Sequence, residues 1–306
     1  MLKRYDIIGD VHGCAAELST LLRLLDDLEG AQCGRRLIIF VGDVIDRGSA
    51  QEQVLSLVQD LEAQGKAVCL LGNHEYNAVM RSLGLRKKED KAHAAFLREY
   101  PQGSARYREA IAWMKRRPWF FAVPGLSVIH ADYNLSMLQQ LAPYLDEQHR
   151  PLNDEVFRLS ARGAPLFAAV EEVLKGGELV LPPGFAITDK EGNVRHELRV
   201  KWWLKDPGSY EEAAFGAREL KLPTGAPDPA SWRWHDGDPQ HLVCVGHYWL
   251  RHESGQSLEE VMRLSEHVIC TDLSCVLGGE LAACTVLIDT NGEVQKTLFN
   301  SVPKQG

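Results

Sequence analysis

The sequence predicts an α/β fold, and three observations support this prediction. Strand-like apolar runs alternate with helix-like segments over residues 5–85, and strand-like runs return over residues 240–300. With 45% hydrophobic residues in 306, the chain also has enough apolar material for a large core. Strand–helix–strand repeats of this length imply a parallel sheet, whose ligands gather beyond the carboxyl ends of the strands.

The N-terminal elements follow one another in a regular order. Residues 5–8 form a short strand, and residues 14–29 carry leucines at helical spacing. Residues 37–41 are a fully apolar second strand. A segment with a helical apolar face follows and stops near Gly65, and residues 68–71 form the third strand.

The rest of the chain is less regular. After the strand-like runs "FFAVPG" and "LSVIH", residues 139–240 are rich in Pro and Gly and read as an insert with short elements. Strands return in "HLVCVG", "HVICTD", "CTVLID" and "QKTLF", and the Asn-Gly of "DTNGE" predicts a hairpin between the last two. We therefore expect a single domain over residues 1–306, with an insert or cap over residues 139–240.

Composition excludes several classes of protein. The formal charge of −8 argues against sequence-independent binding of nucleic acid, although it permits a small phosphorylated substrate. The chain has no apolar run long enough for a membrane span and no signal-like N-terminus. Seven cysteines without a C-x-x-C pair predict reduced core thiols in a cytoplasmic protein. The oligomeric state is not predicted.

Polar side chains follow five of the strand-like runs. These residues are Asp10 and His12, then Asp43, Asp46 and Arg47, then Asn73, His74 and Glu75, and later His130 and His247. Glycines in "GDVHG", "GDVIDRG" and "GNHE" permit tight turns there. Because the carboxyl ends of parallel strands share one edge, we expect these side chains to converge.

Such a set of donors is typical of a metal site. Oxygen and imidazole ligands without thiolate suit Mn²⁺, Fe or Zn²⁺, and converging carboxylates would repel one another without a cation. One bridging carboxylate can hold two metals about 3.5–4 Å apart, and Arg47 can hold phosphate oxygens in a bidentate fork. Each motif alone is more often a turn or a capped histidine, but their conjunction after successive strands favours the metal site.

These motifs carry a family resemblance. "GDVHG", "GDVIDRG", "GNHE", the His130–Ala131 pair and the Gly246–His247 pair resemble the phosphoprotein phosphatase branch of the calcineurin-like metallophosphoesterases. The resemblance covers residues 5–135 and 240–300. It implies a four-layer fold, in which helices flank a central β-sandwich and two metals lie at the sheet edge.

The resemblance also implies a role for each matching residue. Asp10 and His12 would bind the first metal, Asp43 would bridge both, and Asn73, His130 and His247 would bind the second. Arg47 would contact phosphate, and His74, held by Asp46, would protonate the leaving group. We expect two divalent ions, preferably Mn²⁺ with Fe or Zn²⁺ as alternatives, because Mg²⁺ rarely takes histidine ligands.

The substrate is open between two classes. The leading interpretation is a Ser/Thr protein phosphatase-like phosphomonoesterase that acts on a phosphorylated protein or peptide. The segment "ICTDLSCVLGGELAA" is instead similar to bacterial members that include symmetrical diadenosine tetraphosphatases, so a dinucleoside polyphosphate hydrolase is the alternative. A non-catalytic binding module is a distant third, because no expected ligand is missing. Asp272 in this segment is either a partner of a ligand histidine or a turn residue.

Two further features stay undecided. The family's second phosphate-binding arginine lies between the last two histidine ligands, where Arg199 is the candidate and Arg195 and Arg162 compete. Trp202 and Trp203 either stack on an adenine or pack the insert against the core.

Overall fold

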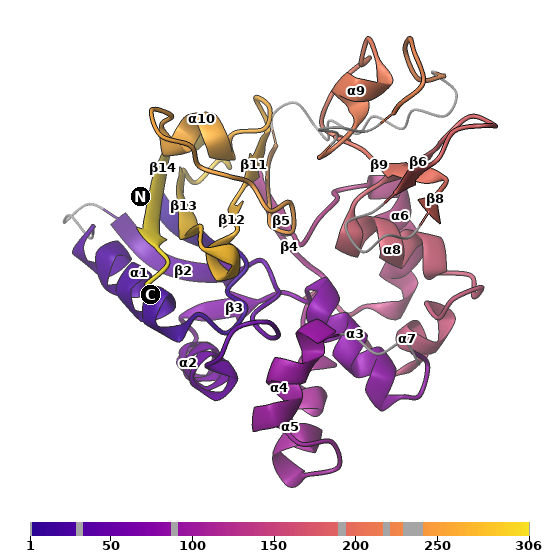
Figure 1. Cartoon of the computed structure of the whole chain (residues 1–306). Coiled ribbons are helices and arrows are strands. Elements are labelled where there is room, and N and C mark those ends of the chain that lie inside the picture. Colours follow the sequence, from indigo (N-terminus) through magenta and orange to yellow (C-terminus); the bar gives the residue numbers. More distant parts are fainter. Residues whose placement is uncertain are drawn as a thin grey trace.

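The computed structural model describes residues 2–28, 33–86, 91–188, 194–216, 221–228 and 241–305 (Figure 1). In this part of the chain, two β-sheets lie together and helices surround them. None of its helices is both long and apolar enough to cross a membrane. Six of its cysteines are buried and free, as predicted for core thiols: Cys14, Cys69, Cys244, Cys270, Cys275 and Cys284.

The larger sheet has six strands in the order β12-β13-β1-β2-β3, with β14 paired to β13. They are β1 (Leu2–Ile8), β2 (Cys33–Phe40), β3 (Ala67–Cys69), β12 (Asp272–Leu273), β13 (Glu280–Ile288) and β14 (Val294–Pro303). The predicted parallel arrangement is confirmed for β1, β2 and β3, whereas β13 runs antiparallel to its three neighbours. The predicted hairpin joins β13 to β14.

The smaller sheet has four strands in the order β11-β10-β5-β4. They are β4 (Phe120–Val123), β5 (Leu126–Ile129), β10 (Leu242–Val245) and β11 (Val268–Cys270). β5 and β10 are parallel neighbours, although the insert separates them in the sequence. Their carboxyl ends therefore bring the loops with His130 and His247 together.

The two sheets pack face to face as a β-sandwich. Because side chains alternate along a strand, each strand sends one set of residues between the sheets. Ile7 and Ile39 of the larger sheet belong to the same buried cluster as Val128 and Cys244 of the smaller one. The predicted sandwich flanked by helices is confirmed.

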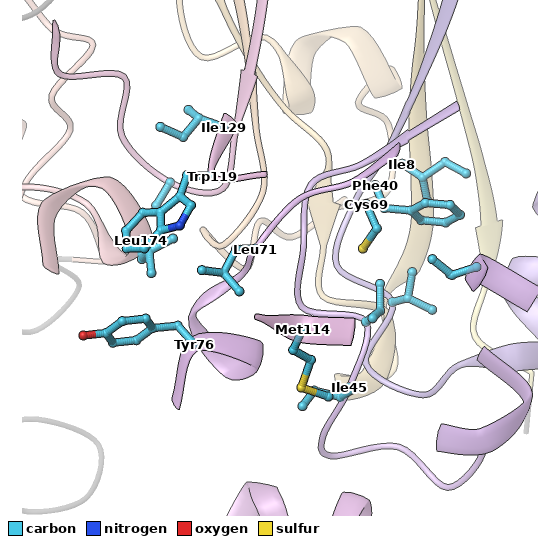
Figure 2. Packing of buried hydrophobic residues seen from close by; sticks show 14 of the residues in the cluster. Ile8, Phe40, Ile45, Cys69, Leu71, Tyr76, Met114, Trp119, Ile129 and Leu174 are labelled. Atoms are coloured by element: carbon cyan, nitrogen blue, oxygen red, sulfur yellow. The ribbon is translucent and has the colours of Figure 1, made fainter. Parts of the chain in front are cut away.

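A second core lies on the outer faces of the sheets. Figure 2 shows part of it, from Ile8, Phe40 and Cys69 on the larger sheet to Trp119 and Leu174. The helices that contribute to it are α1 (Ala15–Asp27), α2 (Gln51–Ala63), α3 (Asn73–Ser82), α4 (Ala94–Glu99), α5 (Ala105–Met114), α6 (Leu135–Leu141), α7 (Glu155–Leu159) and α8 (Phe167–Lys175). Helix α10 (Leu258–Met262) packs instead against the core between the sheets. Short 3₁₀ turns are η1 (Lys91–His93), η2 (Ala142–Tyr144) and η3 (Cys275–Leu277).

The predicted insert contains short elements of its own. They are the antiparallel pair β6 (Glu178–Val180) and β9 (Glu197–Arg199), the pair β7 (Ile187–Thr188) and β8 (Val194–Arg195), and α9 (Tyr210–Ala213). Leu179, Leu198 and Tyr210 belong to a small separate core. The predicted start at residue 139 falls inside α6, and the predicted end lies outside the described residues. That the chain is one domain stays a prediction.

Candidate active site

The loops after β1, β2 and β10 hold backbone conformations that are rare for residues with a side chain. Positive φ angles occur at His12 (44°), Asp43 (52°), Asp46 (73°), Arg47 (65°) and His247 (70°). Such conformations cost free energy and persist where the surrounding structure enforces them, often at functional sites. Five residues that the sequence singled out thus share this strained geometry.

Glu75 holds the loop after β2 in place. Its buried carboxylate accepts backbone N–H groups of Asp43 (2.8 Å), Val44 (3.0 Å), Ile45 (3.1 Å) and Gly72 (3.1 Å). Asn73 lies beyond the end of β3, as predicted for the "GNHE" motif, and it is the first residue of α3. The N-terminus of α3 thereby joins the loop that carries Asp43.

A first group of donor atoms lies around His12. The Nδ1 atom of His12 is 2.7 Å from the Ile45 carbonyl, so Nδ1 carries the proton and Nε2 keeps its lone pair. That Nε2 atom is buried without a hydrogen-bond partner among the described residues, 3.6 Å from Asp43 Oδ2 and 4.0 Å from Asp10 Oδ2. An orphaned acceptor beside two carboxylates is what a cation would satisfy.

A second group shares Asp43 with the first. His130 Nε2 and His247 Nδ1 each lie 3.0 Å from Asn73 Oδ1, and His130 Nε2 lies 3.5 Å from Asp43 Oδ2. Donor atoms of Asp43, His130 and His247 lie within 4.8 Å of one another, as do those of Asp43, His12 and His74. The fold therefore brings together all six residues predicted as metal ligands, with Asp43 common to both groups.

The electrostatics also fit bound cations. Burial raises the pKa of Asp10 well above its ordinary value, and the neighbouring carboxylates Asp272 and Asp43 raise it further. Burial lowers the pKa of His12 to about 3 and that of His247 well below its ordinary value, so both imidazoles are neutral. Imidazoles bind divalent metals in their neutral form, and a bound cation relieves the repulsion between neighbouring carboxylates.

His74 lies beside the first group and is held by Asp46. Its Nδ1 donates to Asp46 Oδ2 at 2.6 Å, and its Nε2 lies 3.8 Å from Asp43 Oδ2. Burial opposes the charged imidazolium, but the carboxylates of Asp43 and Asp46 overcome it and raise the pKa of His74 to about 9. A protonated imidazole thus points Nε2–H toward the site. The predicted pairing of His74 with Asp46 is present.

Arg47 lies at the rim of the site, over an aromatic ring. Its exposed guanidinium is 4.6 Å from the centre of the Trp249 ring. The Trp249 ring also stacks on the ring of His12, with 5.5 Å between the ring centroids and 20° between the planes. Trp249 therefore links the phosphate-binding candidate to a candidate metal ligand.

The structure places the three arginines that compete as the second phosphate-binding residue, and it also places Asp272. Arg199 Nη1 lies 2.8 Å from His247 Nε2, whereas Arg162 and Arg195 line a cavity further out that Arg199 also borders. This contact favours Arg199 over its two competitors. Asp272 accepts the backbone N–H groups of Trp249 (2.8 Å) and Ser274 (2.9 Å), so it organises the backbone after His247.

The two tryptophans pack the insert against the core. Trp202 is 1% exposed and donates from Nε1 to Tyr248 Oη at 2.8 Å, and Trp203 packs edge-on against Phe215. Their faces are therefore occupied by protein, and the adenine-stacking interpretation of Trp202 and Trp203 is wrong.

Sequence reasoning missed His93 and Trp249, and it placed Glu75 near the site without giving it a role. Glu75 carries a signal, since an acidic residue three positions after Gly72 matches a helix start whose side chain reaches back to the first N–H groups. His93 contacts Asp46 from the separate turn η1, and Trp249 reaches Arg47 and His12 across loops. Neither lies in a motif, so the sequence contains no local signal for them.

The chain is similar to known phosphoesterases over most of its length. The calcineurin-like phosphoesterase family matches residues 3–174. The chain is 45% identical over 285 residues to the asymmetrical bis(5'-nucleosyl)-tetraphosphatase PrpE of Anoxybacillus flavithermus, which covers 91% of this chain and 89% of the relative. It is 31% identical over 124 residues to a symmetrical bis(5'-nucleosyl)-tetraphosphatase of Janthinobacterium sp., covering 40% of this chain and 42% of the relative.

A solved structure agrees at the level of the fold. A protein serine/threonine phosphatase from Saccharomyces cerevisiae superposes with a TM-score of 0.52 at 12% identity, covering 99% of this chain and 80% of that one. At that identity the likeness concerns architecture alone. Together with the family match, these findings show that the chain belongs to the calcineurin-like phosphoesterase family, a family of metal-dependent hydrolases.

Proposed function

We propose that this protein hydrolyses dinucleoside polyphosphates of the diadenosine tetraphosphate type at a dinuclear metal centre. The observation that carries the proposal is the 45% identity to a bis(5'-nucleosyl)-tetraphosphatase over 91% of the chain. The sequence motifs alone favoured a protein phosphatase as the leading interpretation. The comparison supports the alternative better, since the likeness to a protein phosphatase is one of fold.

The metal ligands in this proposal are the two groups that share Asp43. One cation would be held by Asp10 and His12. The other would be held by Asn73, His130 and His247, and Asp43 would contact both cations. Two divalent cations at such a centre supply positive charge that polarises a phosphoryl group and lowers the pKa of water. Mn²⁺ is our preferred ion because it accepts mixed carboxylate and imidazole ligands.

The other residues act on the substrate itself. The exposed guanidinium of Arg47 would hold non-bridging phosphate oxygens through paired N–H donors. His74 would give its Nε2 proton to the departing oxygen, and Asp46 would keep the imidazole charged and correctly turned. Arg199, which lies against His247, is the second candidate for a phosphate contact.

A panel of substrates tests this proposal. Initial rates with Mn²⁺ would be measured for diadenosine tetraphosphate, a phosphoserine peptide and p-nitrophenyl phosphate. We expect the highest kcat/KM for diadenosine tetraphosphate. A higher value for the phosphopeptide would favour the protein phosphatase, and no turnover of any substrate with Mn²⁺, Fe²⁺ or Zn²⁺ would favour a non-catalytic module.

A further inference from the structure

A cavity of about 680 Å³ lies next to the candidate active site. Residues of α3, α8, β6, β8 and β9 line it, and this region is on the right of Figure 1. Arg199 belongs to its wall and is also in contact with His247. Tyr76, another wall residue, follows Asn73 on α3. Arg199 therefore connects the wall of the cavity to the candidate metal centre.

The wall of this cavity is cationic, although the chain is acidic. Its charged residues are Arg86, Arg162, Lys175, Arg195 and Arg199 against Glu171, Glu178 and Glu197, a balance of 5 − 3 = +2 in a chain of net charge −8. Two of the three carboxylates are themselves paired, Glu171 with Lys175 and Glu178 with Arg199. The remaining positive charge favours an anion.

Two N–H groups of the wall are buried and unsatisfied. Nε of Arg86 and Nε of Arg199 are shielded from solvent and have no hydrogen-bond partner among the described residues. Buried donors of this kind are normally paired, and ligand oxygens would pair them. Together with the positive balance, they point to a ligand with several anionic oxygens.

Part of the wall is apolar. Met80, Leu85 and the half-buried Phe167 lie among the lining residues. A volume of this size is within the usual range for sites that bind small molecules, which combine apolar walls with a few polar anchors. A ligand with a phosphate chain and a flat base matches both parts of the wall, and Trp202 and Trp203 are buried elsewhere.

We propose that this cavity binds the nucleoside polyphosphate portion of the substrate that extends beyond the scissile phosphorus. Arg86 and Arg162 contact the phosphates, and the apolar wall with Phe167 contacts the base. This inference rests on the proposed function, because it assigns the part of a dinucleoside polyphosphate that the metal centre itself does not hold.

Inhibition of p-nitrophenyl phosphate hydrolysis by three anions tests the inference on the full chain with Mn²⁺. The probes are inorganic phosphate, which reaches the metal centre alone, inorganic tripolyphosphate and ATP. In Arg162→Gln and Arg86→Gln, we expect the inhibition constants of ATP and tripolyphosphate to rise about tenfold each, because each variant loses one charged hydrogen bond to the ligand. The constant for inorganic phosphate should stay within about twofold.

Two further variants separate the parts of the ligand. Phe167→Ala should weaken inhibition by ATP but not by tripolyphosphate, because only ATP has a base. Arg158→Gln is the matched control, since Arg158 is an exposed arginine of α7 outside the cavity wall. Its constants for all three anions should equal those of the parent.

Equal ATP constants in the parent, Arg86→Gln, Arg162→Gln and Arg158→Gln would overturn the inference, as would a parallel rise for inorganic phosphate. A parent that hydrolyses p-nitrophenyl phosphate but not diadenosine tetraphosphate would overturn the proposed function instead. The inhibition constants would then still test whether the cavity binds ATP. If the parent is inactive, calorimetric titration with ATP makes the same comparison, and a parent that does not bind ATP rejects the inference.

Discussion

His93 donates from Nδ1 to Oδ1 of Asp46 at 2.8 Å, and both side chains are buried. The other carboxylate oxygen of Asp46 accepts from His74. Burial alone would raise the pKa of Asp46, but the bonds from the two histidines reverse this and lower it. Asp46 is therefore an ionised carboxylate fixed between two imidazoles, and His93 determines which way it faces His74.

His93→Ala removes one of these two bonds. We expect the free energy of unfolding to fall by about 1–3 kcal/mol, because a buried carboxylate oxygen loses its partner. Hydrolysis of phenyl phosphate should slow by about tenfold as His74 loses its fixed orientation. His93→Gln keeps a donor and should restore most of both. Denaturant unfolding and steady-state kinetics measure the two effects, and parent-like values for His93→Ala would refute the positioning role.

His74→Asn tests the general acid. Phenolate is a much more basic leaving group than nitrophenolate, so it depends on a proton donor. We expect a loss of about 10²–10⁴-fold on phenyl phosphate and a much smaller loss on p-nitrophenyl phosphate, at unchanged metal content. Equal losses on the two substrates, with chemistry rate-limiting for both, would mean that His74 is a metal ligand or a packing residue.

The charge on His74 gives a pH dependence in the metal-free protein. Its pKa is raised to about 9 from an ordinary value of 6.5, so its ion pair with Asp46 stabilises the fold below pH 6.5 and is lost as the pH rises through 9. Asp46→Asn removes one of the charges that raise this pKa. Titration of the ring by NMR should give a clearly lower pKa in that variant, and an unchanged value would remove Asp46 as the cause.

Much of this site can be predicted from the sequence because its residues directly follow apolar runs. Asp10, Asp43 and His130 lie just beyond β1, β2 and β5, where a parallel arrangement must bring the strand ends together. The antiparallel strand β13 follows no such rule, since its pairing with β1 joins the two ends of the described chain, whereas the Asn-Gly turn gives the β13–β14 hairpin a local signal.

The residues that escaped prediction act through packing rather than through a motif. Trp249 contacts Arg47 and His12 because a turn with positive φ (49°) directs its ring there, and His93 reaches Asp46 from a turn with no recognisable pattern. The sequence alone permits Trp202 to stack on a nucleotide base, but the structure buries its ring. Aromatic residues thus carry little positional information until their neighbours are defined.

Trp249→Leu tests the support of Arg47. A cation–π contact contributes about 0.5–2 kcal/mol, so we expect KM for p-nitrophenyl phosphate to rise about 2–30-fold. kcat should change less, and Trp249→Phe should lie between the parent and Trp249→Leu. A fall in kcat with constant KM would show that Trp249 acts on the metal ligands through His12 instead.

The central claim is that Asp43 is shared by two cations, and metal analysis of the parent and Asp43→Asn tests it most directly. After loading with Mn²⁺ and removal of free ions, the parent should retain two ions per chain, and Asp43→Asn should retain fewer, with loss of activity. Chelation of the parent should abolish turnover, and Mn²⁺ should restore it. Two tightly held ions and full activity in Asp43→Asn would contradict the account.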